Sequence, residues 1–317
     1  MHRDHTPGLP GCHHLYQHRC DPAGGHRGTT PRADRGGDMN RVYQPRSALW
    51  WVMLALGVVG YLSYMELMAA RVNSAVLAGG MVVLLAPVLC GVVIWHCSQS
   101  RPLRPSVASV AFLLGACGAT WVAMQGNQAF GFLYYVIPNH AEDWQPAIAG
   151  PFTEEWAKSV LILLIAVLCG LRHPVQGFCI GACVGLGFQT AENIFYVARG
   201  AVEDPNSDVE GALITAVLRL FTALASHWAF SAFAGVGVML LLARRWLSGI
   251  ALVFCGYLCH FLWNTPVEIG NGLGVLALKM LIVDGALFLL VRWMVRADVS
   301  QVAGEGRGRC AGDVVPG

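Results

Sequence analysis

Hydrophobic positions in this chain form long runs, and the polar positions are concentrated between them. The sequence predicts about eight apolar segments, each near the 20 residues that an α-helix needs to cross the hydrocarbon core of a membrane. Their predicted limits are 48–69, 74–97, 105–124, 150–171, 177–198, 222–243, 248–266 and 273–296. The pattern therefore predicts an all-α fold, a polytopic membrane helix bundle.

Composition supports this interpretation. The chain has 317 residues, of which 55% are hydrophobic and only 13% are charged, whereas a soluble protein usually has about 25% charged residues. Because the polar residues are too few to cover a soluble core, a soluble fold is excluded. The net charge of +2 and the lack of a Lys/Arg block give no indication of a nucleic-acid partner. The expected surroundings are a lipid bilayer.

The two ends of the chain differ from the apolar segments. Residues 1–38 are rich in His, Arg, Gly and Pro and lack the apolar region of a signal peptide. We expect a disordered extension, which a true start at Met39 would explain. Residues 297–317 are Gly-rich and charged, which predicts a disordered tail. The domains between them are 39–149 with three spans, 150–266 with four, and 267–296 with the last.

Basic residues determine the predicted orientation, since cytoplasmic loops are enriched in Lys and Arg. With the N-terminus in the cytoplasm, nine arginines flank inner ends of the spans and only Arg71 and Arg199 flank outer ends. The C-terminus is then cytoplasmic too. Residues 211–221, apolar but interrupted by Arg219, are expected to lie along the membrane interface before the sixth span. The nine inner arginines are Arg41, Arg46, Arg101, Arg104, Arg172, Arg244, Arg245, Arg292 and Arg296.

Four of the predicted spans carry ionisable side chains, each of which costs a few kcal/mol at the bilayer centre unless it is paired or solvated. With the predicted orientation and a rise of 1.5 Å per residue, all of them lie about 5–10 Å below the outer surface. Four helices placing polar groups in one layer predict a water-accessible site. The residues are Glu154, Glu155 and Lys158 in the fourth span, Glu192 in the fifth, His227 in the sixth and His260 in the seventh.

Helical spacing relates these side chains to one another. Lys158 lies four residues after Glu154 and three after Glu155, so it can pair with either. The two glutamates point about 100° apart, which leaves one of them free to face the site. A carboxylate beside a histidine is a common pair for general acid–base chemistry. Two further pairs share a helix face, His227 with Ser231 and His260 with Asn264.

The motifs EExxK, FxxxE, HxxxS and HxxxN follow in this order on successive predicted helices from Pro151 to Asn264. Together they resemble the PrsW family of intramembrane proteases, distant relatives of the CAAX prenyl endopeptidases and of the bacteriocin-immunity membrane proteins. Each motif alone has little specificity, but four in order at matching depth are specific. The resemblance implies that 150–266 is the catalytic core. The active-site residues it implies are Glu154, Glu155, Lys158, Glu192, His227 and His260, supported by Ser231 and Asn264.

The resemblance also implies a function. PrsW-like proteases make the first cut in a membrane-anchored anti-sigma factor on its extracytoplasmic side, which agrees with the outer depth of the polar layer. The implied partner is a single-pass membrane protein substrate, and the implied location is the bacterial plasma membrane. In the implied mechanism Glu155 or Glu154 activates water, and His227 polarises that water or protonates the leaving amine. His260 and Asn264 stabilise the oxyanion.

The sequence leaves the role of a metal open. Glu155, Glu192, His227 and His260 are candidate ligands for Zn²⁺ with a position left for water, and the family is often labelled as metalloprotease. The chain contains no HExxH motif, however. The related prenyl endopeptidases resemble glutamate proteases, which require no metal.

Two other functions compete with proteolysis. Buried Glu, His and Lys also mark ion paths in transporters. A carrier is expected to have an inverted repeat and broken helices at mid-membrane, and the sequence indicates neither. A non-catalytic immunity or scaffold protein would keep the same motifs, and only an activity assay distinguishes it from a protease.

Other features are expected to be structural. Gly177, Gly181 and Gly185 form a GxxxGxxxG ridge, which predicts close packing of the fifth span against a neighbour. Lys279 and Asp284 in the last span are expected to pair or to extend toward the interface. The 11 cysteines form no CxxC motif and mostly lie in apolar segments, which favours packing over disulfide, metal or redox roles.

Overall fold

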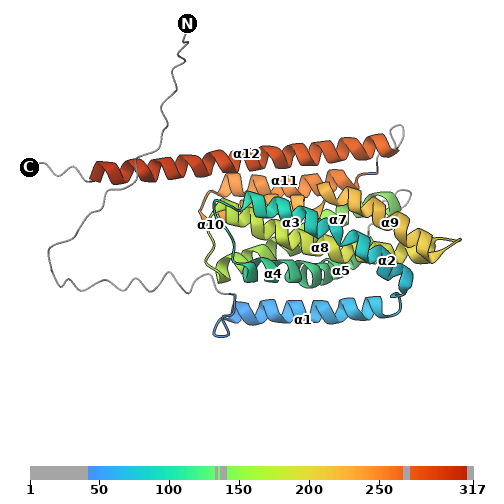
Figure 1. The fold of residues 1–317 in the computed structure, drawn as a ribbon. Coiled ribbons are helices and arrows are strands. Elements are labelled where there is room, and N and C mark those ends of the chain that lie inside the picture. Colours follow the sequence, from blue (N-terminus) through green and yellow to red (C-terminus); the bar gives the residue numbers. More distant parts are fainter. Residues whose placement is uncertain (1–41, 133–134, 136–140, 267–271, 313–317) are drawn as a thin grey trace, which may run out of the picture. The chain divides into compact units, whose positions relative to one another are not determined.

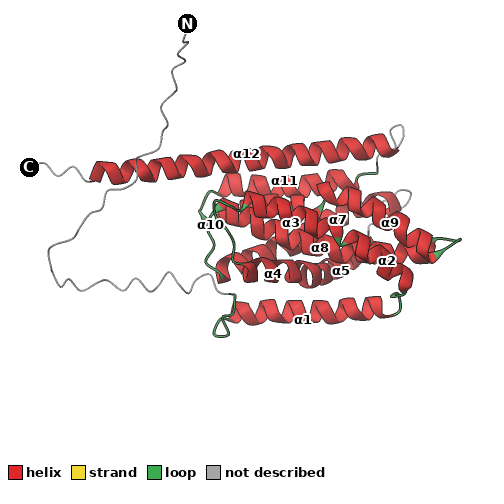
Figure 2. Cartoon of the chain, in the orientation of Figure 1, coloured by secondary structure: helices red, strands yellow, loops and turns green. Residues whose placement is uncertain are grey.

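The computed structural model describes residues 42–132, 135, 141–266 and 272–312, and for 141–142 and 297–312 it describes the backbone alone. The predicted extension 1–38 lies outside these residues. All regular structure in the described part is helical (Figure 2). The α-helices are α1 (Ala48–Ala69), α2 (Ser74–Val83), α3 (Leu85–Cys97), α4 (Pro105–Leu113), α5 (Thr120–Ala129), α7 (Ala141–Leu168), α8 (Pro174–Glu203), α9 (Asp208–Thr222), α10 (His227–Leu242), α11 (Trp246–Asn264) and α12 (Gly272–Gly312). The chain also forms a short π-helix, η1 (Leu114–Ala119), and two short 3-10 helices, η2 (Phe130–Phe132) and η3 (Ala223–Ala225).

Seven stretches within the described residues have the length and composition of membrane-crossing helices. They confirm an all-α, polytopic membrane bundle. The predicted span 150–171 is the one without a counterpart among them, and it lies in α7. That helix has 28 residues and is long enough to cross a membrane. It carries the charged residues Glu154, Glu155 and Lys158, which lower its hydropathy. The seven stretches are Ala48–Ala69, Ser74–Cys97, Pro105–Phe132, Pro174–Glu203, Asp208–Leu242, Trp246–Asn264 and Gly272–Arg296.

Residues 211–221 belong to α9, which packs against α2 and α8 and is followed by η3 and α10. Small residues make this packing possible, because a Cβ atom at Gly211 would overlap the carbonyl oxygen of Gly200 on α8. Ala212 and Ala216 are fully buried on the same side of α9. One side of α9 is thus covered by protein, and its predicted position along the membrane interface stays a prediction.

Helix α12 is longer than predicted. Its backbone remains helical from residue 297 through Gly312, so the prediction of a disordered tail is wrong for these residues. The stretch contains no proline, and each added residue can therefore extend the backbone hydrogen-bond ladder of the preceding turns.

Helix α8 lies at the centre of the bundle. It contacts α2, α3, α4, α7, α9 and α10, and Figure 1 shows it surrounded by neighbouring helices. Of its membrane-crossing stretch 78% is buried, against 17% for α1. Two other helices that carry site residues, α7 and α10, therefore pack against a helix that is mostly buried in protein.

The glycine ridge on α8 packs closely against a neighbouring helix, as predicted, and the structure identifies that helix as α10. A Cβ atom at Gly177 would overlap the carbonyl oxygen of Gly235, and one at Gly181 would overlap that of Ser231. At Gly185 the overlap would be with the carbonyl oxygen of His227. Only glycine permits this approach, so the ridge determines how closely the helix carrying Glu192 comes to His227.

The sixth span is broken directly before His227. Helix α9 ends at Thr222, η3 follows, and Ser226 adopts a non-helical backbone with φ −127° and ψ −149°. The sequence gives no sign of this break, because no proline or glycine lies between Thr222 and His227. Broken helices at mid-membrane were the feature expected of a carrier. In this chain the break makes His227 the first residue of α10 and so contributes to the position of a site residue.

Candidate active site

Five of the eight predicted polar side chains line one cavity of about 360 Å³. Helices α7, α8, α10 and α11 each supply part of its lining, which agrees with a common layer. The side of the cavity formed by α1 and α5 includes Tyr64 and Asn127, although the first three spans carry no motif. Of the predicted residues, those that line the cavity are Glu154, Glu192, His227, His260 and Asn264.

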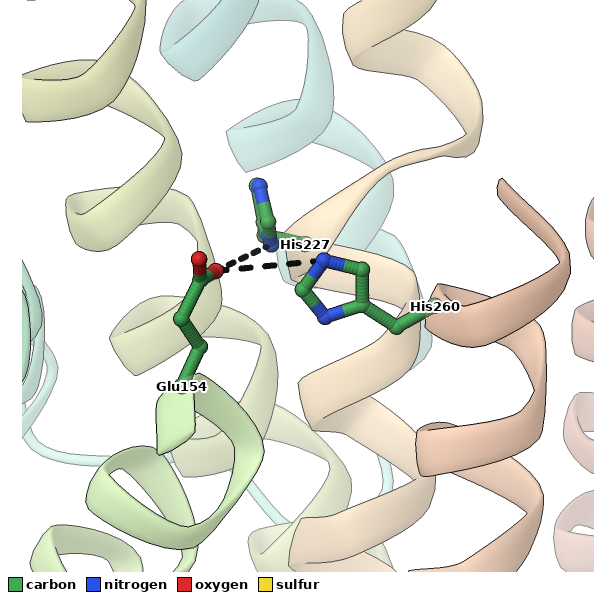
Figure 3. A group of neighbouring side chains, drawn as sticks. All are labelled: Glu154, His227 and His260. Atoms are coloured by element: carbon green, nitrogen blue, oxygen red, sulfur yellow. Dashed lines mark ion pairs between the residues drawn. The ribbon is translucent and has the colours of Figure 1, made fainter. Parts of the chain in front are cut away.

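Glu154 lies at the centre of the group. Its Oε2 atom is 3.8 Å from Nδ1 of His227 and 3.8 Å from Nε2 of His260 (Figure 3). The side chain is buried, and Oε2 has no hydrogen-bond partner within the described part of the chain. A buried carboxylate oxygen without a hydrogen bond is costly, and the ion pair with Lys158 at 3.6 Å compensates it only in part. We infer that this atom is kept for a ligand or a substrate water.

His260 is held by what we call the His260 group, which consists of His260, Glu155 and Lys158. The ring Nδ1–H donates to Oε1 of Glu155 at 2.9 Å, and Nζ of Lys158 donates to the same oxygen at 2.8 Å. Asn264 Nδ2 donates to Nε2 of His260 at 3.2 Å and to the carbonyl oxygen of Pro146 at 2.9 Å. Because an amide nitrogen only donates, Nε2 is the acceptor and Nδ1 carries the hydrogen.

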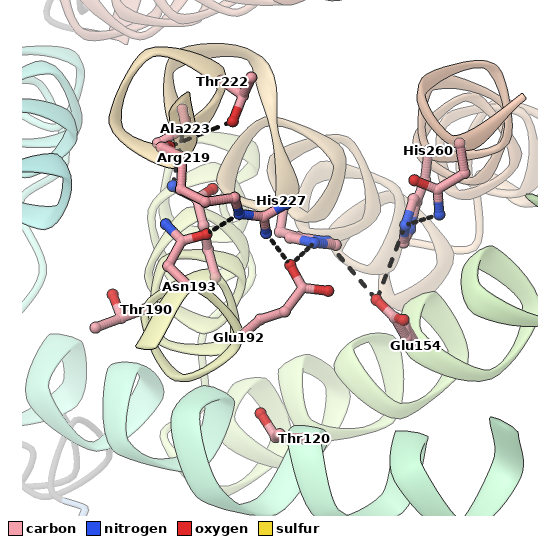
Figure 4. Close-up of polar contacts among 12 residues, drawn as sticks. Thr120, Glu154, Thr190, Glu192, Asn193, Arg219, Thr222, Ala223, His227 and His260 are labelled. Carbon is pink, nitrogen blue, oxygen red and sulfur yellow. Dashed lines mark hydrogen bonds and ion pairs between the residues drawn. The ribbon is translucent and has the colours of Figure 1, made fainter. Parts of the chain in front are cut away.

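His227 is held by a similar set, the His227 group, which consists of His227, Glu192 and Arg219. The ring Nε2–H donates to Oε2 of Glu192 at 3.0 Å, and Arg219 Nη2 donates to that oxygen too (Figure 4). The second ring nitrogen, Nδ1, accepts from Nζ of Lys158 at 2.9 Å. Each histidine thus donates to a carboxylate and directs its other nitrogen toward Glu154.

Lys158 distinguishes the two adjacent glutamates. Its side chain is fully buried and Nζ lies 2.8 Å from Glu155 but 3.6 Å from Glu154. The ammonium also lies 3.8 Å from the centre of the Phe188 ring, a cation–π contact. Glu155 is therefore the paired glutamate and does not line the cavity, whereas Glu154 is the one that faces it.

Gln189 supports the helix break from α8. Its Nε2 donates to the carbonyl oxygen of Ala223 at 3.2 Å, and its Oε1 accepts from the backbone N–H of Trp228 at 3.4 Å. Gln189 is buried and joins both sides of the break, which fixes His227 at the start of α10. Sequence reasoning missed this role, although a polar residue one turn before Glu192 was a usable signal.

Ser231 lies apart from the cavity. It is fully buried between α10 and α8, where a Cβ atom at Gly185 would be 2.7 Å from its Oγ. Aromatic rings support the two imidazoles instead: Phe188 lies 5.0 Å from the His227 ring, and Phe230 stacks on His260 at 5.0 Å. The sequence indicated none of these ring contacts beyond the presence of Phe188 in its motif.

Within the described residues, the group able to hold a metal is Glu154, His227 and His260, whose donor atoms lie within 4.8 Å of one another. It differs from the predicted ligands, because Glu155 and Glu192 bond to the outer nitrogens of the histidines. A carboxylate on the outer nitrogen is the usual arrangement for a metal-bound histidine. Because Zn–N and Zn–O distances are about 2.0–2.2 Å, two donors of one Zn²⁺ lie at most about 4.4 Å apart. The three side chains must therefore move slightly closer together to share one ion.

The comparisons with known proteins identify the family of this chain. A protein-family model described as PrsW family intramembrane metalloprotease matches residues 104–293. No curated protein matches the chain, and neither does any solved structure. The matched region covers more than half of the chain and includes every helix that contributes to the His260 and His227 groups. The chain therefore belongs to the PrsW family and is an intramembrane protease.

Proposed function

We propose that this protein hydrolyses a peptide bond of a membrane-anchored substrate at the cavity beside Glu154. The observation that carries the proposal is Oε2 of Glu154, which is buried, has no hydrogen-bond partner among the described residues and lies between ring nitrogens of two histidines. A carboxylate in this position can take a proton from an attacking water and return it to the leaving amine. Glu154, rather than Glu155, is then the base.

The neighbouring residues prepare this step. Glu155 and Glu192 orient the two imidazoles through their outer nitrogens. The Asn264 amide lines the cavity and can donate to the oxygen that becomes negative during attack. His260 Nε2 is an acceptor in this arrangement, so Asn264 is the better candidate for oxyanion stabilisation.

The catalytic type that we favour is the metal-dependent one. Three acceptor atoms, from Glu154, His227 and His260, converge within 4.8 Å, and a cation is the natural partner for them. Zn²⁺ held by these residues would supply a polarised water and a Lewis acid for the scissile carbonyl. Oε2 of Glu154 would then serve as a ligand instead of as the general base. Lys158 Nζ lies 2.9 Å from Nδ1 of His227, so it must withdraw from that nitrogen when a cation binds.

The substrate that we propose is a single-pass membrane protein, such as an anti-sigma factor, in the bacterial plasma membrane. The family resemblance supports this choice. The distribution of arginines supports a cleavage site near the extracytoplasmic face, because it places the outer ends of α8 and α11 and the polar layer on that side.

The test compares cleavage of a single-pass substrate from the same genome by the wild-type protein and by Glu154→Gln, both purified in detergent. We expect Glu154→Gln to lower kcat by about 10²–10⁴-fold, the usual contribution of a general base. The control is Glu203→Gln, since Glu203 is exposed and pairs only with exposed Arg199 among the contacts described. If Glu154→Gln cleaves as fast as the wild type, the proposal is wrong.

The same assay with a chelator tests the metal. If the chelator abolishes cleavage and Zn²⁺ restores it, the protein is metal-dependent, as we propose for a site formed by Glu154, His227 and His260. If the chelator has no effect while Glu154→Gln is inactive, the protein is a glutamate protease and the metal part of the proposal is wrong.

A further inference from the structure

Arg219 is a cavity residue that lies outside the four motifs. It comes from α9, near the end of that helix and one turn before the break at η3. Its side chain is about one-fifth exposed (21%) and lines the cavity. A cation inside a membrane bundle is costly unless its partners compensate it, so its contacts identify its role.

The guanidinium of Arg219 makes three contacts. Nη2 donates to Oε2 of Glu192, Nε donates to Oδ1 of Asn193 at 2.6 Å, and the group lies 4.3 Å from the centre of the Tyr196 ring. All three partners are on α8 (Figure 4 shows the two hydrogen bonds). The planar guanidinium can make these contacts at once, whereas an ammonium cannot reproduce the two directed bonds.

The oxygen of Glu192 that Arg219 contacts is also the acceptor for His227 Nε2–H. The rotamer of Glu192 therefore depends on both partners. Glu192 is one-fifth exposed (20%), so without Arg219 water could compete for its carboxylate. The imidazole of His227 would then lose the bond that directs Nδ1 toward Glu154.

We propose that Arg219 is a positioning residue of the active site: it holds Glu192, and Glu192 in turn orients His227. The inference rests on the proposed function, since it assigns Arg219 to the same catalytic step. Arg219 acts through Glu192 and does not contact the reacting atoms. It also ties α9 to α8 beside the break, where Gln189 joins Ala223 to Trp228.

The test is a double-mutant cycle in the substrate assay, with kcat and KM measured for wild type, Arg219→Gln, Glu192→Gln and the double variant. We expect Arg219→Gln to lower kcat by about 10–100-fold, as removal of an outer partner of a site histidine typically does, with KM within about twofold. In the Glu192→Gln background, Arg219→Gln should cost less than about threefold, because coupled residues are not additive.

Two variants separate positioning from folding. Arg219→Lys keeps the charge but loses one directed bond, so we expect it to recover part of the lost kcat. The matched control is Arg292→Gln, because Arg292 is exposed on α12 and its guanidinium lies over Phe288. It should leave kcat and the thermal unfolding midpoint unchanged.

Different results would overturn different claims. If the losses from Arg219→Gln and Glu192→Gln multiply in the double variant, Arg219 does not act through Glu192 and the inference is wrong. If Arg219→Gln raises KM and leaves kcat unchanged, Arg219 binds substrate and the inference is also wrong. If the wild type cleaves no substrate while Glu154→Gln is equally inactive, it is the proposed function that fails.

Discussion

The His260 group and the His227 group have the same chemistry in different surroundings. In each, a histidine donates to a carboxylate, and that carboxylate also accepts from a cation. In the His260 group the carboxylate and the cation, Glu155 and Lys158, lie on one helix and are almost completely buried. In the His227 group they come from α8 and α9 and are each about one-fifth exposed.

The difference in exposure decides what each charge costs. A buried ion pair gains from the low dielectric only while both partners are present, and removal of one leaves an uncompensated charge. At the cavity wall water can take the place of a lost partner, so the energetic penalty is smaller. The His260 group should therefore matter for folding and catalysis, and the His227 group mainly for catalysis.

Glu155→Gln and Glu192→Gln give the largest expected contrast. Glu155→Gln leaves Lys158 without its nearest carboxylate, and we expect a loss of about 3–5 kcal/mol in the free energy of unfolding. Glu192→Gln should cost at most about 1 kcal/mol, while lowering kcat by about 10–100-fold. Reversible unfolding in detergent, followed by circular dichroism, measures the first quantity. Equal stability losses in the two variants would refute the comparison.

The control for these two variants is the same Glu→Gln substitution at a position outside both groups. Glu203→Gln, on the exposed end of α8, breaks a pair whose side chains are each 58% exposed. We expect a change below about 1 kcal/mol. A larger loss would mean that detergent, rather than the site, determines the stability of the variants.

The sequence predicted the His260 group better than the His227 group because the carboxylate and the cation of the His260 group are close together in the sequence. Lys158 and Glu155 are three residues apart on one helix, and helical periodicity alone brings them together. Arg219 and Glu192 are 27 residues apart on different helices, and their contact depends on how α9 packs. Periodicity does not contain that information, so Arg219 was interpreted only as an interruption of an apolar segment.

The fold shows the same limit. Apolar runs predicted the spans, because burial in lipid requires long hydrophobic helices. The break before His227 was not predictable, since tertiary bonds from Gln189 stabilise it and no local breaker marks it. The ridge of glycines was predictable as a packing surface, but its partner α10 was not. The orientation of the termini stays a prediction.

Two glycines test how closely neighbouring helices must pack beside each group. Gly185 lies next to His227, and Gly150 lies next to Asn264, which bonds to His260. A Cβ atom at Gly185 would overlap the backbone of His227, whereas one at Gly150 would lie 3.3 Å from Asn264 Nδ2 and 3.4 Å from Glu154 Oε1. The backbone cannot yield easily, so we expect Gly185→Ala to destabilise the protein by about 1–3 kcal/mol. Gly150→Ala should cost less, because the atoms it meets are side-chain ends.

Thermal unfolding of both variants measures this difference, with Gly285→Ala as control. Gly285 lies inside α12 and has open space around its Cα, so alanine there should be neutral or stabilising by up to about 1 kcal/mol. If Gly150→Ala proves more damaging than Gly185→Ala, the His227 group tolerates more movement than its contacts with α8 suggest.

Asn264→Ala has the smallest expected effect on stability. It removes the uncharged side chain that bonds to one of the two site histidines. His260 Nε2 accepts from the Asn264 amide, which also donates to the Pro146 carbonyl oxygen, whereas His227 Nδ1 accepts from an ammonium. Losing neutral bonds costs about 0.5–1.5 kcal/mol, so the unfolding free energy should fall by about that amount. Asn206→Ala, in the exposed loop after α8, is the matched control and should change nothing. Because the amide also lines the cavity, kcat should fall more than stability does; if only stability falls, Asn264 anchors α11 to α7 and has no part in stabilising the oxyanion.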